Sequence, residues 1–146
     1  KWDKKNPITI GWSNPEAALH LSNEVDFISF HYYKKPEYFL ESYKILRYLT
    51  PNKSIVLQEY GDSSYGGMWS LFLGSDEKQA AYYKEMQGYL EKEKIPFLFW
   101  TLYDFEKVPS SVAGSLPWKT KKQHFFGCID SLGNKKPAYY ELAIKK

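Results

Sequence analysis

The sequence predicts an α/β fold made of four consecutive βα units with parallel strands. Four short apolar runs alternate with stretches of helical periodicity along the chain. The runs are too apolar for an antiparallel sheet with one face in water, and near-continuous apolar strands are typical of a parallel sheet covered by helices. A length of 146 residues fits one domain. We therefore expect a single domain over residues 1–146 with the element order βαβαβαβα.

The predicted strands span residues 8–12, 26–31, 54–59 and 96–102. Helices are predicted over residues 15–23, 36–49, 75–94 and 137–144. Asn14 is a suitable N-cap before Pro15, and Ser75 begins the longest helix. Two irregular stretches, residues 60–74 and 103–126, follow strand ends. Loops of that length inside a compact domain are usually functional.

Composition narrows the classes of function. Charged residues make up 25% of the chain, the net charge is +3, and the lysines are dispersed, so no nucleic-acid interface is predicted. The sequence contains no run of 18 apolar residues, so no membrane-spanning helix is predicted. The single Cys128 is expected to be buried, and neither a metal site nor a cofactor motif is predicted. Aromatic residues reach 18%, which suggests a flat, partly polar ligand such as a sugar ring.

Glu59 is the principal candidate for chemistry because it stands where an apolar strand ends and a glycine-bearing loop begins. Ligands of parallel α/β proteins gather at the carboxyl ends of strands. Strand alternation places Glu59 with Leu57 and Ile55. If this is the ligand side, three side chains from the neighbouring strands reach it as well: His31, Tyr33 and Trp100.

The strand ends resemble those of a known group. Phe30-His31-Tyr32-Tyr33, Leu57-Gln58-Glu59-Tyr60-Gly61 and Phe99-Trp100-Thr101-Leu102-Tyr103-Asp104-Phe105 are similar to strands six, seven and eight of retaining (β/α)8-barrel glycoside hydrolases, the superfamily of cellulases, mannanases and β-galactosidases. The segment 126–140 is similar to the "G-x-x-D-x-x-G-x-x-K-P-A-Y" stretch that leads into the last helix of such barrels. The chain thus resembles the second half of a barrel.

This resemblance implies a role for each candidate. Glu59 would be the nucleophile, His31 and Tyr33 would line the subsite of the cleaved sugar, and Trp100 would stack beneath that sugar. It also implies cleavage of β-linked hexosides or polysaccharide by a retaining double displacement, and a secreted or periplasmic location. Substrate identity, gluco against manno or galacto, stays open because the subsites draw on both halves of a barrel.

A full barrel needs about 250 residues and eight strands, and this chain provides four. The resemblance places the acid/base glutamate before Lys1, and Glu24 sits at the wrong end of its strand to replace it. We therefore expect a fragment that needs a missing N-terminal half-barrel, or a second copy, as partner. Two alternatives remain: a non-catalytic carbohydrate-binding or structural half-barrel, and a flavodoxin-like nucleotide-binding sheet, which lacks a glycine-rich phosphate loop here.

Several other residues have a predicted environment. Asp104 and Trp118 are expected on the surface of the last long loop, with contact to a sugar as the alternative. Trp12 is expected in the core, with a place at the mouth of the sheet as the alternative. His20 and His124 show no partner in the sequence.

Overall fold

The computed structural model describes residues 5–142 and divides them into two compact units. Unit 1 comprises the residues up to Tyr60 together with 88–99, and unit 2 comprises residues 61–87 and those from Trp100 on. The chain therefore passes from one unit to the other after Tyr60, after Gln87 and after Phe99.

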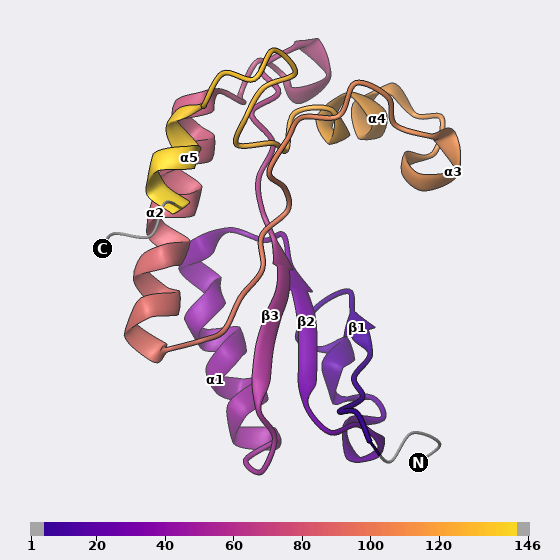
Figure 1. Cartoon of the computed structure of the whole chain (residues 1–146), viewed down its shortest axis with the longest axis vertical. Coiled ribbons are helices and arrows are strands. Elements are labelled where there is room, and N and C mark those ends of the chain that lie inside the picture. Colours follow the sequence, from indigo (N-terminus) through magenta and orange to yellow (C-terminus); the bar gives the residue numbers. More distant parts are fainter. Residues whose placement is uncertain (1–4, 143–146) are drawn as a thin grey trace. The chain divides into compact units, whose positions relative to one another are not determined.

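Unit 1 is built on a parallel sheet. Its strands are β1 (Gly11–Trp12), β2 (Ile28–Tyr32) and β3 (Ile55–Tyr60), in the order β1-β2-β3 (Figure 1). Both strand pairs are parallel. The predicted parallel α/β class is therefore confirmed, with strands at three of the four predicted places.

The fourth apolar run, residues 96–102, forms only one parallel bridge, between Phe97 and Leu57. The amide of Leu57 donates to the Pro96 carbonyl over 2.9 Å, and the amide of Leu98 donates to the Leu57 carbonyl over 2.9 Å. The run then passes into unit 2, where the Leu102 carbonyl accepts a hydrogen bond from Ile129. The predicted strand fails to form as one element because its two ends pair with different partners.

The first predicted helix is replaced by two 3-10 turns, η1 (Ala17–Leu19) and η2 (Ser22–Glu24). Asn14 does accept a hydrogen bond at Oδ1 from the amide of Ala17, at 2.7 Å. Leu21 then adopts a left-handed backbone with φ of 57°, a conformation that a continuing helix does not allow.

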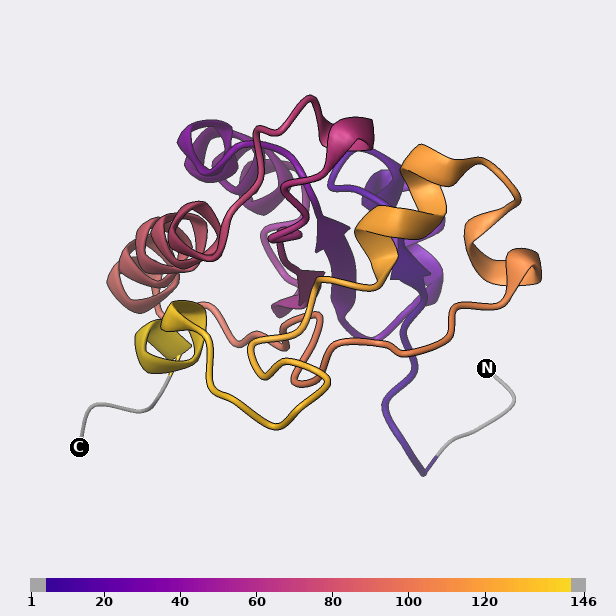
Figure 2. The same cartoon turned by 90° about the horizontal axis from the view of Figure 1, so that it is seen from above.

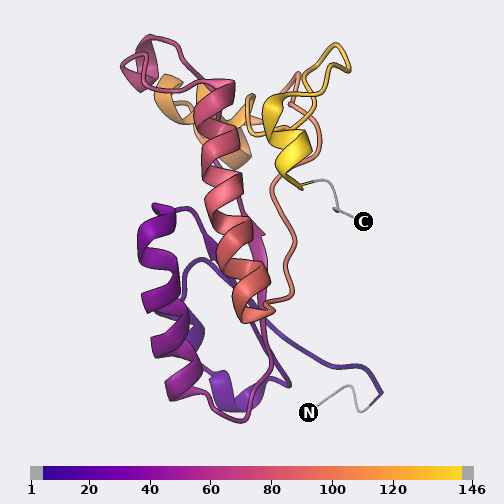
Figure 3. The ribbon, with the colours of Figure 1, turned by 90° about the vertical axis from the view of Figure 1, so that its left-hand side faces the viewer.

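The second predicted helix is confirmed by η3 (Pro36–Tyr38) and α1 (Phe39–Leu49). Helix α2 (Asp76–Glu93) confirms the third, and Ser75 Oγ accepts from the amide of Lys78 over 3.2 Å, as expected at a helix start. Figure 3 shows α1 beside the carboxyl-terminal end of α2. Phe39 of α1 joins them, because its ring packs on Tyr89 with 6.4 Å between centroids.

The core of unit 1 lies between the sheet and these helices. Phe39 is fully buried and meets Tyr32 of β2 edge-on, with 5.1 Å between ring centroids. Trp12 is buried, as expected. Among the described residues, the other fully buried apolar side chains of this unit are those of Ala18, Ile28, Phe30, Leu46, Leu57, Tyr60 and Leu90.

Unit 2 holds the short elements η4 (Met68–Ser70), α3 (Ser110–Ala113), α4 (Pro117–Gln123) and α5 (Pro137–Leu142). The two long stretches expected to be irregular therefore contain helical turns, and Figure 2 shows η4 beside α4. The predicted end of the last helix, residues 143–144, lies outside the described residues. Cys128 is buried with a free thiol, as expected, and burial raises its pKa to about 11.

Within residues 5–142, no helix has the length and apolar character to cross a membrane.

Removing the ring of Phe39 should destabilise unit 1. Phe39→Ala leaves a cavity between α1, β2 and Tyr89, and we expect a loss of about 3–5 kcal/mol in the free energy of unfolding. Tyr48 stands on the same helix with 83% of its surface exposed, so Tyr48→Ala should change stability by less than about 0.5 kcal/mol. Urea unfolding monitored by circular dichroism compares the two. Equal losses would contradict this packing.

Candidate functional site

Glu59 meets two predicted partners at the carboxyl ends of β2 and β3. His31 of β2 pairs in register with Glu59 of β3, and Tyr33 follows directly after β2. The Tyr33 hydroxyl donates a hydrogen bond to Glu59 Oε1. His31 Nε2 lies 3.8 Å from Glu59 Oε2, and both of these side chains keep 27% of their surface exposed. The carboxylate is thus held and still accessible.

A β-bulge in β3 brings this contact about. Phe30 pairs with Leu57, and the next residue of β2, His31, pairs with Glu59, so Gln58 is an extra residue in β3. Gln58 Oε1 lies 2.9 Å from Ser29 Oγ, which shows that the Gln58 side chain is on the side of Ser29. Glu59 reaches that same side through His31, while Leu57 is fully buried. A bulge changes the direction in which the following side chains point. Glu59 therefore does not share the side of Leu57 and Ile55, as strand alternation predicted, because the alternation is interrupted at Gln58.

Polar side chains support this side of the sheet below the carboxylate. Ser29 Oγ lies 3.1 Å from Thr9 Oγ1 and 3.0 Å from the Ile10 carbonyl, in addition to its contact with Gln58. A Cβ atom at Gly11 would come within 2.7 Å of Gln58 Oε1, so β1 requires glycine or a shift of Gln58 here. These contacts join the three strands at the level just before Glu59.

The two tyrosines at the end of β2 have different environments. Tyr33 is exposed and bonded to Glu59, whereas Tyr32 is buried and donates to the Lys35 carbonyl over 2.8 Å. Burial, followed by the charges of Glu16 and Glu37, raises the pKa of Tyr32 to about 12. Tyr32 is thus a structural phenol that stays protonated, and Tyr33 is the phenol of the site.

Trp100 belongs to unit 2, so its predicted place beneath a sugar held by Glu59 stays a prediction. Its ring is half-buried and packs on Phe105, with 5.5 Å between centroids. Its carbonyl accepts a hydrogen bond from the Tyr83 hydroxyl over 2.9 Å, and its peptide bond to Thr101 is cis. A Cβ atom at Gly61 would lie 2.1 Å from this carbonyl, so position 61 admits only glycine.

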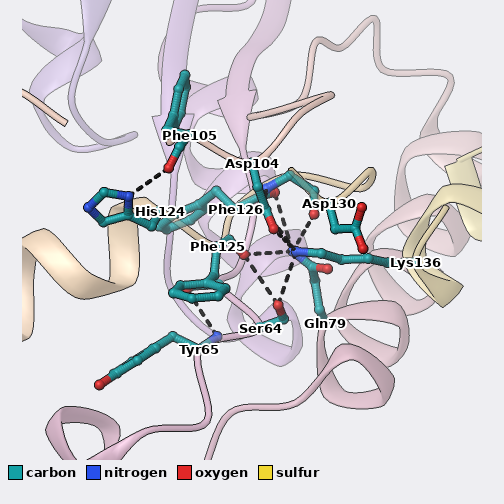
Figure 4. Close-up of polar contacts among 12 residues, drawn as sticks. Ser64, Tyr65, Gln79, Asp104, Phe105, His124, Phe125, Phe126, Asp130 and Lys136 are labelled. Carbon is teal, nitrogen blue, oxygen red and sulfur yellow. Dashed lines mark hydrogen bonds and ion pairs between the residues drawn. The ribbon is translucent and has the colours of Figure 1, made fainter. Parts of the chain in front are cut away.

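Asp104 is not the surface residue that the sequence suggested. It forms a buried ion pair with Lys136, whose Nζ lies 2.8 Å from Oδ1 and 2.7 Å from Oδ2 (Figure 4). The two side chains are only 8% and 6% exposed. Lys136 also donates to Ser64 Oγ over 3.2 Å, and the Gly127 amide donates to Asp104 Oδ1 over 2.8 Å. Such burial is tolerated because every charge is paired and hydrogen-bonded.

The segment 127–139, identified by resemblance, has a structural explanation. Asp130 accepts hydrogen bonds from the amides of Leu132 and Asn134, at 2.9 and 2.7 Å, and Gly133 takes a φ of 86° in the turn. Hydrogen bonds from the Asn134 side chain and backbone lower the pKa of Asp130. Lys136 enters the ion pair, and α5 begins at once with Pro137. The pattern therefore describes a fold-stabilising turn.

The side chain of Gln79 in α2 connects several segments of unit 2, a role that we did not predict. Its Nε2 lies 2.9 Å from the Asp62 carbonyl and 3.2 to 3.3 Å from the carbonyls of Phe125, Phe126 and Gly127 (Figure 4). It is fully buried. Its spacing with Tyr83, Met86 and Leu90, at i, i+4, i+7 and i+11, would have placed it on the buried face of the helix.

The environments of the remaining residues discussed from the sequence are as follows. His124 is close to the Phe105 carbonyl, with 2.6 Å between Nδ1 and the oxygen, while His20 and Glu24 are exposed. Trp118 is exposed, as expected. Within residues 5–142, no group of three or more His, Cys, Asp or Glu side chains is arranged to hold a metal ion.

The sequence matches no protein-family model, and no curated protein resembles it in sequence. Solved structures do resemble the fold. The Bacteroides uniformis β-glucuronidase superposes with a TM-score of 0.73 at 18% identity, over 97% of this chain and 18% of its own. A Rhizomucor miehei β-1,3-glucanosyltransferase in complex with laminaritriose superposes with a TM-score of 0.65 at 17% identity, over 90% of this chain and 49% of its own. A putative β-galactosidase from Bacteroides fragilis superposes with a TM-score of 0.69 at 17% identity, over 94% of this chain and 22% of its own.

These likenesses establish the fold. The chain folds like part of a (β/α)8 barrel, as its sequence suggested. It spans about half of the glucanosyltransferase and about a fifth of the β-glucuronidase.

The buried ion pair predicts a large and specific effect of mutation. Lys136→Met leaves Asp104 buried and unpaired, and we expect it to lower the free energy of unfolding by about 3–5 kcal/mol. Its neighbour Lys135 is exposed above the ring of Tyr139, so Lys135→Met should cost less than about 1 kcal/mol.

Urea unfolding measures both variants and the double variant Lys136→Met/Asp104→Asn. The double variant removes the orphaned charge and keeps an acceptor for the Gly127 amide, so it should recover about 2 kcal/mol. A Lys136→Met protein as stable as Lys135→Met would refute the proposed role of the pair.

Proposed function

We propose that the chain is the C-terminal half of a retaining glycoside hydrolase barrel that cleaves β-linked hexosides, with Glu59 as nucleophile. The observation that carries the proposal is the cluster of Tyr33, His31 and Glu59 at the carboxyl ends of two adjacent parallel strands. Carboxylates at this end of a barrel strand are the usual carriers of catalysis. The fold likeness supports the proposal, because the similar structures include a glucanosyltransferase, a glucuronidase and a putative galactosidase.

The mechanism follows from the geometry around Glu59. The Tyr33 hydroxyl holds Oε1 and leaves Oε2 for attack on the anomeric carbon. Attack forms a glycosyl ester, while the bond from that carbon to the leaving oxygen breaks and this oxygen takes a proton from a second carboxyl group. The resulting carboxylate then removes a proton from water, whose oxygen displaces Glu59 and restores the original anomeric configuration.

The second carboxyl group is proposed to come from a part of the barrel that this chain does not span. A retaining enzyme places it roughly 5 Å from the nucleophile. The chain covers 18% to 49% of the similar proteins, which leaves room for such a contribution from a missing half-barrel or a second copy. His31 and Tyr33 would line the subsite of the cleaved sugar, and Trp100 would stack on that sugar.

The alternative is a carbohydrate-binding or structural half-barrel without catalysis. The observation that favours it is that Glu59 is the only strand-end carboxylate that the sequence identifies for this chemistry. Aryl glycosides with a good leaving group separate the two functions, because they reduce the need for the acid.

Glu59→Gln should abolish hydrolysis in the full-length protein. The substitution removes the attacking oxygen at nearly constant shape, so we expect kcat/KM for 2,4-dinitrophenyl β-hexosides to fall at least about 1000-fold. Glu24→Gln is the matched control, because Glu24 is exposed in η2, before β2 begins, and it should retain activity. A 2-fluoro-β-hexosyl fluoride should label Glu59, as seen by peptide mass spectrometry. Label on another carboxylate of an active protein would reject the assignment.

Tyr33→Phe should slow formation of the glycosyl ester without changing where it forms. Loss of the charge-assisted hydrogen bond to Oε1 should lower the rate constant of labelling by the fluoroglycoside about 10- to 100-fold. Glu59 should remain the labelled residue, and the thermal stability should be nearly unchanged because the Tyr33 side chain is exposed. The control is Tyr38→Phe, another exposed tyrosine of the same unit. An unaltered labelling rate in Tyr33→Phe would show that the phenol does not orient the carboxylate.

A further inference from the structure

Unit 2 contains a concave site that the proposed mechanism does not use. Its volume is about 740 Å³, within the range of small-molecule sites. It is formed by η4 on one side and by α3 and α4 on the other, and Figure 2 shows η4 beside α4. Its chemical character comes from four of its lining residues, Trp69, Trp118, Lys119 and Lys122.

Two indole rings contribute to this pocket and both are accessible. Trp69 is 42% exposed and Trp118 is 46% exposed. Their centroids lie 6.2 Å apart with 47° between the ring planes, so the rings touch and open at an angle. An exposed indole combines a flat apolar face with an N–H donor, which suits the apolar face and hydroxyl groups of a sugar ring.

Positive charge accompanies the two rings. Lys122 stands four residues after Trp118 and three after Lys119 in α4, so it is a surface neighbour of each, and all three line the pocket. The residues that line it include no carboxylate. The whole segment 107–129 carries four lysines and no Asp or Glu. Lys122 interacts electrostatically with Asp62. Burial raises the pKa of Asp62, although the hydrogen bond from the Ser63 amide and the charge of Lys122 both act to lower it.

The walls of the pocket are fixed by hydrogen bonds. Ser63 Oγ donates to the Lys122 carbonyl over 2.7 Å, and the Ser64 amide donates to the Phe125 carbonyl over 3.0 Å. Ser70 Oγ lies 2.7 Å from the Tyr65 carbonyl and 2.9 Å from the Gly67 carbonyl, which closes the turn that carries Trp69. Both indoles are therefore presented by anchored segments, as a preformed site requires.

From these observations we propose that this pocket, named here the Trp69–Trp118 pocket, binds an anionic saccharide, with the indoles against the sugar ring and Lys119 and Lys122 facing its carboxylate or sulfate. The pocket belongs to unit 2 alone, and its binding of a saccharide does not depend on Glu59 being catalytic. A neutral sugar would use the rings and leave the lysines without a partner in the ligand.

The test is ¹⁹F NMR of the full-length protein with 5-fluorotryptophan, in which Trp69→Phe and Trp118→Phe assign the two signals. Methyl β-D-glucuronide and methyl β-D-glucoside 6-sulfate should shift both signals and bind roughly tenfold more tightly than methyl β-D-glucoside. The preference should shrink as the salt concentration rises from about 50 to about 300 mM.

Lys119→Gln/Lys122→Gln should remove the tenfold preference and leave the weak binding of the neutral glucoside. Lys107→Gln/Lys121→Gln changes the net charge equally and should keep the preference, because neither residue lines the pocket. Unchanged signals of the other tryptophans show that each variant is folded.

Three results would overturn the proposal. The first is equal affinity for charged and neutral sugars, and the second is a shift confined to tryptophans other than Trp69 and Trp118. The third is a response of these two signals to phosphatidylserine vesicles but to neither anionic sugar, which would assign the surface to a membrane. A shift of Trp69 and Trp118 in a protein whose Glu59 proves inert would uphold the pocket and refute only the proposed catalysis.

Discussion

The register between β2 and β3 is the constraint on which the candidate site depends. Parallel pairing alone would place successive residues of the two strands opposite one another, and Gln58 interrupts that sequence. The extra residue brings Glu59 opposite His31 and within reach of Tyr33, while Leu57 remains in the core. The local geometry of one residue therefore determines whether the carboxylate faces its partners. The hydrogen bonds of Ser29 to neighbouring strands keep the bulge in place.

Unit 2 depends on a different interaction, the buried pair of Asp104 and Lys136. The pair joins the chain after Trp100 to the turn before α5, and Ser64 attaches the loop after β3 to the same ammonium group. Gln79 adds a second junction, in which a single amide group reaches four carbonyl oxygens. Irregular backbone segments are held here by side-chain donors, because few of their own amides and carbonyls pair in ladders.

The fold class and the proximity of His31 and Tyr33 to Glu59 could be predicted, since apolar runs and strand ends leave direct traces in the chain, whereas the place of Trp100 relative to Glu59 stays a prediction. Alternation could not locate the bulge at Gln58, because a bulge depends on pairing with another strand. Asp104 was placed on the surface because an acid in a long loop is normally solvated, and only the fold reveals Lys136 as its partner 32 residues away. The division of residues 96–102 between two units was hidden for the same reason.

The separation between Asp104 and Lys136 has a consequence for synthesis of the protein. Ribosomes add about 5–20 residues per second, so Lys136, which follows Asp104 by 32 residues, is added roughly 2–6 s later. During that interval the Asp104 carboxylate must stay in water, and the carbonyls that later bind Gln79 have not yet formed their junction. The loop after β3 waits even longer, because Ser64 precedes Lys136 by 72 residues. A nascent chain thus cannot close these contacts before Lys136 has been made, so the segments that the contacts join fold against each other only late in synthesis.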